Sequence, residues 1–453
     1  MLAKEGTMNV FAPAEFDRIV IVSDEISDSG GAAAVALSSV RHLAARGVRT
    51  TVLLGRASAG FAAPAGVEIV ALGGSKLTEA AGASQALAGL YDAGVYGAVR
   101  EWIARNDTPR TLYHLHNWHK ALSPSVFRAL RPVASRLAIT AHDYFLVCPN
   151  GGYFNFRSGE VCGLRPMSAS CAACNCDKRR FAHKAWRLAR HGVRAALFPL
   201  PATPALVIAP HAGVTEFLER GGVRRDCIRI LRNPVTPWRE RRVDAEAQKR
   251  ILFVGRLERD KGVDLLADAA DRRGISLSIV GDGPLLEPLR RRFPRHDYLG
   301  WKSRPEVSEI AASARLVVCS TLWPETFCLT AFEAAASGIP VLMSRNALAA
   351  DELAARDAGE LFNPLDVDAT GASLRRLLDD SERIAFMSRR AFAQRRELAP
   401  DPERFCDSML AIYRELLARS ARDLAPQPER ARGGGVLASR QAPFSSPFSP
   451  ERK

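Results

Sequence analysis

The sequence has no long apolar run. Its uncharged stretch from Ala195 to Pro210 is short and contains four prolines, which interrupt helices. A helix that crosses a bilayer needs about 20 apolar residues, so we expect no transmembrane helix. The N-terminal residues also lack an apolar segment, because Lys4, Glu5 and Glu15 interrupt them. We therefore expect neither a secretory signal nor a mitochondrial presequence, and a cytoplasmic location.

Acidic residues are fewer than basic ones. The 453 residues include 49 Asp and Glu against 63 Lys and Arg, which gives a formal net charge of +14. Such a charge suits anionic substrates, an anionic membrane surface or nucleic acid. It is also what an Ala- and Arg-rich sequence carries as solvated surface. Because no nucleic-acid-binding motif accompanies the charge, we expect no nucleic-acid partner.

Cysteine is scarce, with nine residues in the chain. Because this number is odd and we expect a cytoplasmic location, a disulfide framework is not expected. Five of the nine nevertheless fall in one window rich in turn-forming residues, which we expect to be an insertion at about 145–177. Cys148, Cys162, Cys171 and Cys174 could supply four thiolates to a structural zinc ion, with Cys176 as a substitute ligand. The alternative is a reduced cysteine-rich loop without metal.

Short β-branched apolar runs alternate with helical patterns along most of the chain. This alternation predicts βαβ units, and hence doubly wound parallel sheets covered on both faces. The charged stretch 239–250 lacks apolar periodicity and predicts a linker between two α/β domains. The expected strands are 18–23, 50–54, 111–116, 136–142 and 205–210 in the first half, and 250–255, 276–281, 315–320 and 340–344 in the second.

The expected domain boundaries follow from these patterns. An N-terminal domain covers residues 1–245, and a C-terminal domain covers residues 246–400. A helix at 401–420 is expected to pack back on the N-terminal domain. Residues 421–453 are rich in Pro, Gly, Ser and Arg without periodicity, so we expect a disordered tail there.

Two glutamates lie at the expected carboxyl end of a strand, where open α/β sheets bind ligands. In WPETFCLTAFEAAASGIPV, Glu325 falls in the loop after the strand, and Glu333 falls one turn into a helix expected to begin near Leu329. The N–H groups at the start of that helix suit a diphosphate. The two carboxylates can accept hydrogen bonds from sugar hydroxyls. The alternative is that Glu325 is only an acid at the N-terminus of the helix and Glu333 a solvated helix residue.

Two cations follow another expected strand. In FVGRLERDKGVDLL, Arg256 comes after a glycine turn, and Lys261 lies at the start of the next helix. Cations at the mouth of a sheet can neutralise a departing phosphate group. Alone, such residues are usually solvated, so the pair acquires meaning only with the two glutamates.

Together these segments and VGDGPLLEPL (280–289) resemble the retaining, GT-B-fold glycosyltransferases of family four. The resemblance runs from about residue 18 to residue 415 and is strongest from 250 to 345. It implies two Rossmann-like domains that face a cleft, with a nucleotide-diphosphate sugar held by the C-terminal one. By resemblance, Glu325 contacts the hydroxyls of the donor sugar, Glu333 the ribose, and Arg256 with Lys261 the diphosphate. The donor site would also include Thr326, Phe327, Cys328 and Leu329.

The N-terminal half adds candidates for the opposite side of the cleft. Gly30 and Gly31 could let the backbone approach a phosphate at a helix start, although a glycine pair is also an ordinary turn. By resemblance, His142 in ITAHDYF reaches the donor sugar, and LHNWHK, with His116, Asn117 and His119, lines the acceptor side. One departure from the family pattern is Cys328, which stands where a small glycine is common.

The implied activity is transfer of a glycosyl group to an acceptor hydroxyl, with retention of anomeric configuration. Catalysis would rest on Glu325, His142, Arg256 and Lys261 and would require no cofactor. The acceptor would be a saccharide or a lipid-linked molecule in surface polysaccharide or glycolipid synthesis. A nucleotide-sugar epimerase, a phosphorylase and a binding protein that kept the fold are the alternatives.

A basic segment, KRRFAHKAWRLARHGVR, begins at Lys178 and contains no acidic residue. Its cations and its aromatic and apolar residues are typical of a helix that binds an anionic membrane surface, here the inner face of the membrane. Such a helix would bring the active site to a membrane-proximal acceptor. The alternative is a helix that packs on its own domain, with Trp186 and Leu188 in the core and the arginines in water.

Overall fold

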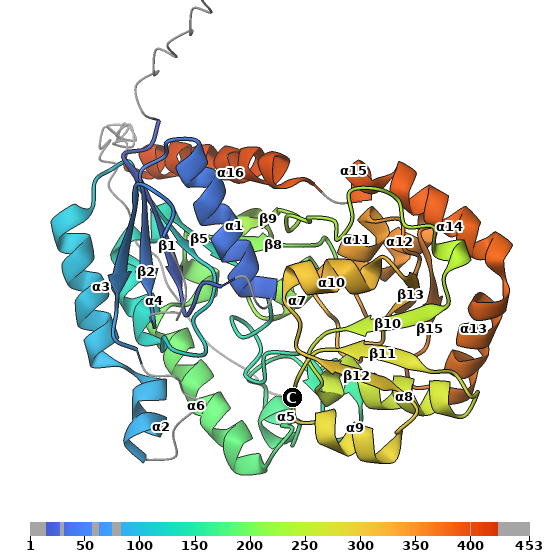
Figure 1. Cartoon of the computed structure of the whole chain (residues 1–453). Helices are drawn as coiled ribbons and strands as arrows, with labels where there is room; N and C mark the ends of the chain where they lie inside the picture. The colour runs from blue at the N-terminus through green and yellow to red at the C-terminus, as the bar shows by residue number, and fades with distance from the viewer. Residues whose placement is uncertain (1–14, 28–30, 57–62, 75–82, 399, 425–453) are drawn as a thin grey trace, which may run out of the picture.

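The computed structural model describes residues 15–27, 31–56, 63–74, 83–398 and 400–424, which form two α/β lobes (Figure 1). The N-terminal lobe contains a parallel seven-stranded sheet in the order β3-β2-β1-β4-β5-β8-β9. The C-terminal lobe contains a parallel six-stranded sheet in the order β12-β11-β10-β13-β14-β15. In each sheet the order reverses beside the first strand of the lobe, as in doubly wound folds. The predicted fold of two Rossmann-like domains is confirmed.

The strands of the N-terminal sheet are β1 (Arg18–Ser23), β2 (Thr50–Leu54), β3 (Val67–Ala71), β4 (Thr111–Leu115), β5 (Leu137–Thr140), β8 (Leu206–Ala209) and β9 (Ile228–Ile230). Those of the C-terminal sheet are β10 (Arg250–Val254), β11 (Leu277–Val280), β12 (Asp297–Gly300), β13 (Ala314–Cys319), β14 (Val341–Ser344) and β15 (Gly359–Phe362). The helices of the N-terminal lobe are α1 (Gly31–Ala45), α2 (Ala83–Leu90), α3 (Ala93–Asn106), α4 (Ser125–Leu130), α5 (Ala169–Ala173), α6 (Phe181–Leu197) and α7 (Val214–Arg220). The remaining helices are α8 (Val263–Asp271), α9 (Leu286–Arg292), α10 (Arg304–Ala311), α11 (Leu329–Ala336), α12 (Ala350–Ala355), α13 (Val367–Asp379), α14 (Ser381–Ala393), α15 (Arg395–Leu398) and α16 (Pro402–Leu424).

Strand β1 shows why these runs become central strands. Successive side chains of a strand point to opposite faces of the sheet. Ile19 and Ile21 accordingly pack into one apolar cluster, and Val20 and Val22 pack into another on the opposite face. Since each fully buried aliphatic side chain contributes about 1.5–3 kcal/mol, a run that is apolar at every position is stable only when helices cover both faces.

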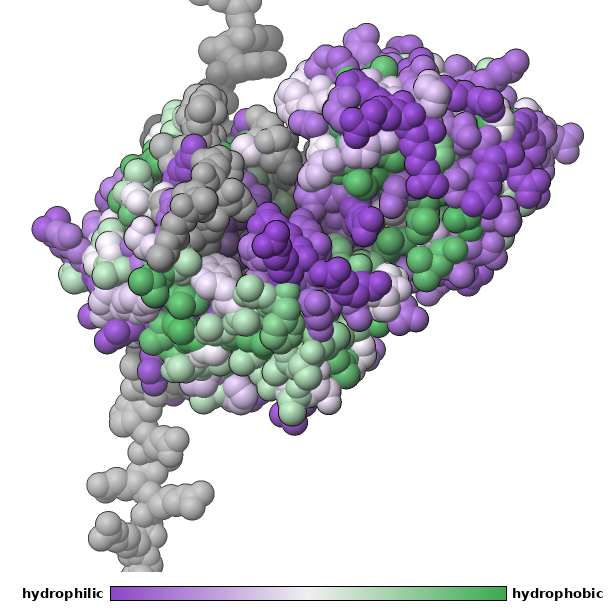
Figure 2. Space-filling view, turned by 90° about the horizontal axis from the view of Figure 1, so that it is seen from below, coloured by the Kyte–Doolittle hydropathy of each residue, from purple (hydrophilic) through white to green (hydrophobic). Residues whose placement is uncertain are grey.

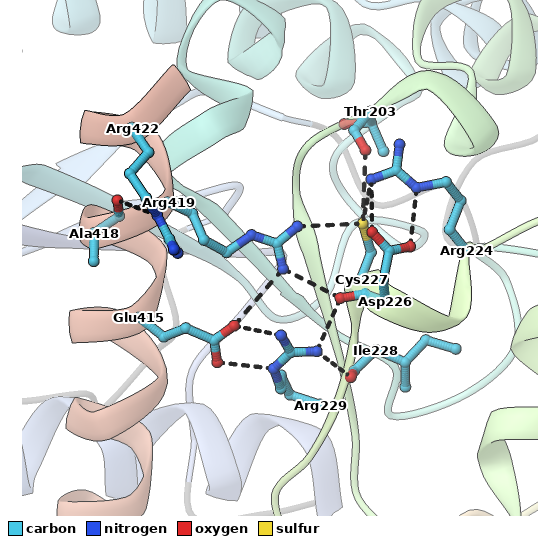
Figure 3. A network of polar contacts seen from close by, with 10 residues as sticks. All are labelled: Thr203, Arg224, Asp226, Cys227, Ile228, Arg229, Glu415, Ala418, Arg419 and Arg422. Atoms are coloured by element: carbon cyan, nitrogen blue, oxygen red, sulfur yellow. Dashed lines mark hydrogen bonds and ion pairs between the residues drawn. The ribbon is translucent and has the colours of Figure 1, made fainter. Parts of the chain in front are cut away.

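Helix α16 crosses from the C-terminal lobe back onto the N-terminal lobe (Figure 1). Its residues Phe405, Met409 and Tyr413, four positions apart on one helix face, are buried in the N-terminal core. Figure 3 shows the polar side of the contact, where Glu415 accepts hydrogen bonds from Arg229 of β9. The helix continues to Leu424, so residues 421–424 of the expected tail are helical. The rest of that tail lies outside the described residues.

The cysteine-rich insertion contains a two-stranded antiparallel sheet, formed by β6 (Phe154–Asn155) and β7 (Glu160–Val161), and leads into α6. Helix α6 packs on its own lobe, but the expectation that its arginines lie in water is wrong. Its cations Lys184, Arg190 and Arg194 are buried, while Phe181 is exposed. In the part of the chain that the structure describes, no helix combines the length and apolar character needed to cross a membrane.

Candidate active site at the carboxyl ends of the C-terminal sheet

Lys261 and Glu325 form an ion pair between two loops of the C-terminal sheet. Lys261 follows β10 and Glu325 follows β13, and Nζ of the lysine lies 2.5 Å from Oε1 of the glutamate. The lysine ammonium also lies 5.8 Å from the ring centroid of Trp323, a cation–π contact. Burial disfavours the charged lysine, yet the Glu325 carboxylate raises the pKa of Lys261 above its ordinary value. The ammonium of Lys261 is therefore charged at neutral pH, and the contact with Glu325 holds it in place.

Gly262 makes the position of Lys261 possible. Its φ of 63° lies in the left-handed region, and a Cβ at this position would come within 2.2 Å of the carbonyl oxygen of Ser320. The hydroxyl of Ser320 in turn donates to the carbonyl of Lys261 at 2.7 Å. The loop after β10 thus lies directly against the end of β13, which brings the two charged residues together.

Arg256 is held by two carboxylates that the sequence analysis did not single out. Its guanidinium donates to Glu258 at 2.6 Å and to Asp260 at 3.2 Å. Although burial opposes the charge, these two carboxylates raise the pKa of Arg256. Glu258 also pairs at 2.7 Å with Lys178 of the N-terminal lobe. Arg256 is therefore linked through Glu258 to a residue of the N-terminal lobe.

Glu333 lies one turn into α11, largely buried. It accepts hydrogen bonds from Arg304 at 2.7 Å and from the indole N–H of Trp238 at 3.1 Å. Burial raises the pKa of Glu333 against the opposing effect of Arg304. Neither partner was predicted, because Arg304 and Trp238 are distant in sequence and carry no motif. In this structure both carboxylates of the glutamate motif have cationic partners.

The start of α11 faces the start of α1 in the other lobe. A side chain at Gly31 would come within 3.4 Å of Leu329, so the two helix N-termini lie close together. The expected partner Gly30 lies outside the described residues. Thr326 links the lobes directly, since its hydroxyl donates to the carbonyl of His142 at 2.8 Å. Phe327 is buried and stacks on Phe332 at a centroid distance of 4.6 Å, so its ring belongs to the core.

Cys328 occupies the left-handed region of the backbone, with φ of 57° and ψ of 67°. This is the conformation that glycine adopts without penalty, and in other L-residues it costs roughly 1–2 kcal/mol. The backbone therefore keeps the geometry of a glycine although the residue is a cysteine.

The histidines of the N-terminal lobe form a stacked group at the ends of β4 and β5. Nδ1 of His116 lies 3.0 Å from Nε2 of His142. Burial lowers the pKa of His142 to about 3 and that of His116 well below its ordinary value, so both rings are neutral at physiological pH. Among the described residues, buried Nε2 of His116 has no hydrogen-bond partner. A neutral imidazole with an unused nitrogen can still bind a hydroxyl.

His119 and Asn117 occupy the loop after β4. Nδ1 of His119 lies 3.5 Å from Oδ2 of Asp143, and its ring stacks on Phe145 at 4.3 Å. Burial raises the pKa of Asp143 to about 6, which makes it a titratable acid near neutral pH. Its position directly after His142 was the one available sequence signal. Asn117 is buried, and its carbonyl accepts a hydrogen bond from the backbone of Asp24.

Two cysteines of the insertion, Cys171 and Cys176, lie beside the buried ammonium of Lys184, and we call them the cysteine group. Nζ of Lys184 lies 3.3 Å from Sγ of Cys176 and 3.6 Å from Sγ of Cys171. Burial opposes the charge, but the sulfur atoms of these cysteines raise the pKa of Lys184. Within the described residues, no group of three or more Cys, His, Asp or Glu side chains is arranged to hold a metal ion. The predicted zinc ligands Cys148, Cys162, Cys171 and Cys174 are therefore not arranged as such a site.

Residues 235–394 match the family model described as glycosyl transferases group 1. A GDP-mannose-dependent alpha-mannosyltransferase of Corynebacterium glutamicum is 34% identical over 177 residues, which are 39% of this chain and 42% of that protein. The chain thus spans less than half the length of this curated relative.

Similarity of fold extends further than similarity of sequence. Sucrose-phosphate synthase from Thermosynechococcus elongatus has a TM-score of 0.65 at 18% identity, covering 88% of this chain and 99% of that one. The Anabaena protein HepE in complex with UDP-glucose has a TM-score of 0.59 at 16% identity, covering 87% and 98%. At such identities the likeness concerns the fold alone.

Proposed function

We propose that the whole chain transfers a sugar from a nucleotide-diphosphate donor to an acceptor hydroxyl, and the match of residues 235–394 to the glycosyl transferases group 1 model supports this. The observation that carries the proposal is the Lys261–Glu325 ion pair. It lies beside the N-terminus of α11, opposite the N-terminus of α1. The same family match does not favour an epimerase, a phosphorylase or an inactive binding protein.

In this proposal the two members of the ion pair bind different parts of the donor. Lys261, with Arg256 and the N–H groups at the start of α11, binds the diphosphate and stabilises the negative charge that develops as the glycosidic bond breaks. Glu325 accepts hydrogen bonds from the sugar hydroxyls, and Glu333 accepts them from the ribose. Arg304 must then share Glu333 with the ribose. The residues between the glutamates contribute chiefly through backbone, since Phe327 and Cys328 are buried.

The acceptor enters from the N-terminal lobe. We assign His142 to the donor sugar, and His116, Asn117 and His119 to the acceptor side. The unpartnered Nε2 of His116 and the contact of His119 with Asp143 support this assignment. We infer a saccharide or a lipid-linked acceptor, as in polysaccharide or glycolipid synthesis. We also propose that the anomeric configuration is retained, because the motifs resemble those of retaining glycosyltransferases.

The donor is tested by binding before turnover. Thermal unfolding with GDP-mannose and UDP-glucose separates the two nucleotides that the similar proteins are described with, since a ligand of the folded state raises the melting temperature. Release of nucleoside diphosphate that depends on an added acceptor would establish transfer. Conversion of the donor sugar to its epimer without any acceptor would instead favour an epimerase.

A structural zinc ion belongs to this proposal only as a hypothesis with a direct test. A cation at the cysteine group would have to displace the ammonium of Lys184, which already lies among the sulfur atoms. Elemental analysis of protein purified without chelator measures the metal. One equivalent of zinc would establish the site, and a much lower content would leave Lys184 as the cation of the cysteine group.

A further inference from the structure

Helix α6 has its charged face inside the protein and its apolar face outside. Lys184, Arg190 and Arg194 are 1%, 5% and 3% exposed, whereas Phe181 is 47% exposed. With 3.6 residues per turn, the alanines at 182, 185, 189 and 196 lie on the same side as Phe181 and are exposed with it. This distribution is the reverse of the usual surface helix, whose polar residues face water.

The inward cations make their contacts within the protein itself. Arg190 donates to the carbonyls of Gly89 in α2 and Leu122 at 2.8 and 2.9 Å. Arg194 donates to the carbonyl of Phe198 and lies 3.0 Å from His191. Lys184 is held by the cysteine group. These side chains cannot reach an anionic surface, so the attraction expected from the sequence of this helix does not arise from them.

The outward face continues onto neighbouring elements. Helix α2 packs beside α6, and the indole N–H of Trp186 donates to the carbonyl of Ala86 at 3.0 Å. Leu87 of α2 is 65% exposed, and Met167, which lies against Gly192 of α6, is 43% exposed. Figure 2, which looks at this end of the molecule, shows apolar residues gathered over the N-terminal lobe. We call Leu87, Met167, Phe181 and the exposed alanines of α6 the apolar face.

The chemistry around the apolar face selects its partner. Arg179, Arg180 and His183 are exposed at the start of α6, and Arg165 is exposed two residues before Met167. Neither α2 nor α6 contains an acidic residue. Protruding Phe and Leu side chains bordered by arginines match the boundary between acyl chains and anionic headgroups. We propose that the apolar face docks on an anionic lipid bilayer.

The apolar face lies close in the chain to the proposed donor site, and the consequence of docking for catalysis rests on the proposed function. Lys178 lies three residues before Phe181 and pairs with Glu258, which also holds Arg256. The docked surface is therefore adjacent in the chain to the residues at the lobe boundary. A lipid-linked acceptor in the bilayer would then lie close to the donor site, whereas a freely diffusing acceptor would gain nothing from docking.

Flotation of the full chain with vesicles tests the proposal. The probes are vesicles of phosphatidylcholine alone and of phosphatidylcholine with phosphatidylglycerol, each at low and high salt. We expect wild type to float with the anionic vesicles and Leu87→Ser/Phe181→Ser to lower the bound fraction at least about tenfold, because two apolar side chains no longer insert. Arg179→Gln/Arg180→Gln should reduce the salt-sensitive part of binding. The matched control is Leu365→Ser, since Leu365 is also exposed but lies on the C-terminal lobe.

Three outcomes would overturn the proposal. In the first, wild type does not float with anionic vesicles. In the second, the Leu87→Ser/Phe181→Ser variant floats as well as wild type. In the third, wild type forms a concentration-dependent dimer that this variant does not form. The last would assign the face to a second copy of the chain. Acceptor-independent binding of the donor is measured on the same variants and should not change. If wild type does not bind the donor, the proposed function is wrong, but the flotation result still stands.

Discussion

Nζ of Lys261 lies 2.5 Å from Oε1 of Glu325, although the two residues are 64 positions apart in the chain. The contact joins the loops after β10 and β13, neighbouring strands at the centre of the C-terminal sheet. The contact orients both side chains in a largely buried place, and Glu325 helps to keep Lys261 charged. An enzyme that must stabilise a departing diphosphate gains from such a cation, because it needs no reorganisation during the reaction.

We expect Lys261→Ala and Glu325→Ala each to reduce turnover at least about a hundredfold, the scale for losing one preorganised charged group. The pair also stabilises each partner, so removing one leaves a buried charge unpaired. Each variant is therefore compared with wild type by circular dichroism and by initial rates with the true substrates. Glu325→Gln retains the shape and tests the charge alone.

The control for these variants is Lys302→Ala, which removes an exposed lysine that pairs with Glu306 on the surface of the same lobe. It should leave both rate and stability near wild type, because exposed ion pairs contribute about 0–1 kcal/mol. Near wild-type turnover in a folded Lys261→Ala or Glu325→Ala variant would show that the proposed site is wrong.

Backbone strain at Cys328 gives a second prediction. We expect Cys328→Gly to leave turnover within about threefold of wild type and stability within about 1 kcal/mol, since relief of the left-handed strain offsets lost packing and greater unfolded-state entropy. Cys328→Val should destabilise by more than 1 kcal/mol, because a β-branched residue fits this conformation poorly. Urea unfolding of both variants checks the order, and a Val variant as stable as the Gly variant would contradict it.

The sequence predicted the central strands well and the edges poorly. A run such as β1, apolar at every position, can fold only between two covered faces. Strand β3, in contrast, is half exposed and contains Glu68, so its pattern resembles a loop as much as a strand. The two candidate glutamates, Glu325 and Glu333, could likewise be found from local spacing. Their partner Arg304 could not, because that contact depends on how α10 and α11 pack.

Helix α6 shows a different limit of sequence reasoning. Its composition suggested cations in water or at a headgroup, because burying a charge without partners is costly. The partners of Arg190 are backbone carbonyls of Gly89 and Leu122, which are 101 and 68 positions away. No local sequence pattern predicts that these distant carbonyls will lie around the guanidinium of Arg190. Only the assembled lobe shows which face of the helix is turned outward.

Buried neutral histidines predict how stability depends on pH. Burial lowers the pKa of His114 from 6.5 to about 3, while its ring bonds Tyr413 of α16 and Thr140 at 2.6 and 2.7 Å. Between these two pKa values the unfolded chain binds the proton and the folded chain does not, so the free energy of unfolding falls as pH decreases below about 6.5. Its contribution is complete above that pH and is lost progressively towards pH 3.

We expect His114→Gln to flatten this dependence, because an amide can bond the same hydroxyls but cannot take up a proton at these pH values. Urea unfolding of wild type and variant at a series of pH values from 4 to 7.5, in the pH range where an unfolded histidine titrates, measures the difference. The stability of wild type relative to the variant should decrease on acidification by about 1.4 kcal/mol per pH unit at most. Parallel curves for the two proteins would contradict the assignment.

A hydrogen bond from Tyr144 links the N-terminal lobe to the loop that contains Glu325. The hydroxyl of Tyr144 donates at 2.7 Å to the carbonyl of Pro324, directly before Glu325, while Thr326 on the other side donates to His142. We expect Tyr144→Phe to lower kcat/KM about tenfold, because a small shift of Glu325 misplaces a charged group whose value depends on its geometry. The loss of one hydrogen bond should cost only about 1 kcal/mol of stability.

Tyr298→Phe is the matched control, since the hydroxyl of Tyr298 also donates to a backbone carbonyl, that of Phe293, within the C-terminal lobe. The two variants should lose similar stability in urea unfolding, yet only Tyr144→Phe should lose activity. An equal loss of activity in both would mean that catalysis responds to general stability. No loss in either would mean that the position of Glu325 is fixed by its ion pair with Lys261 alone, because that contact lies within one lobe and survives both substitutions.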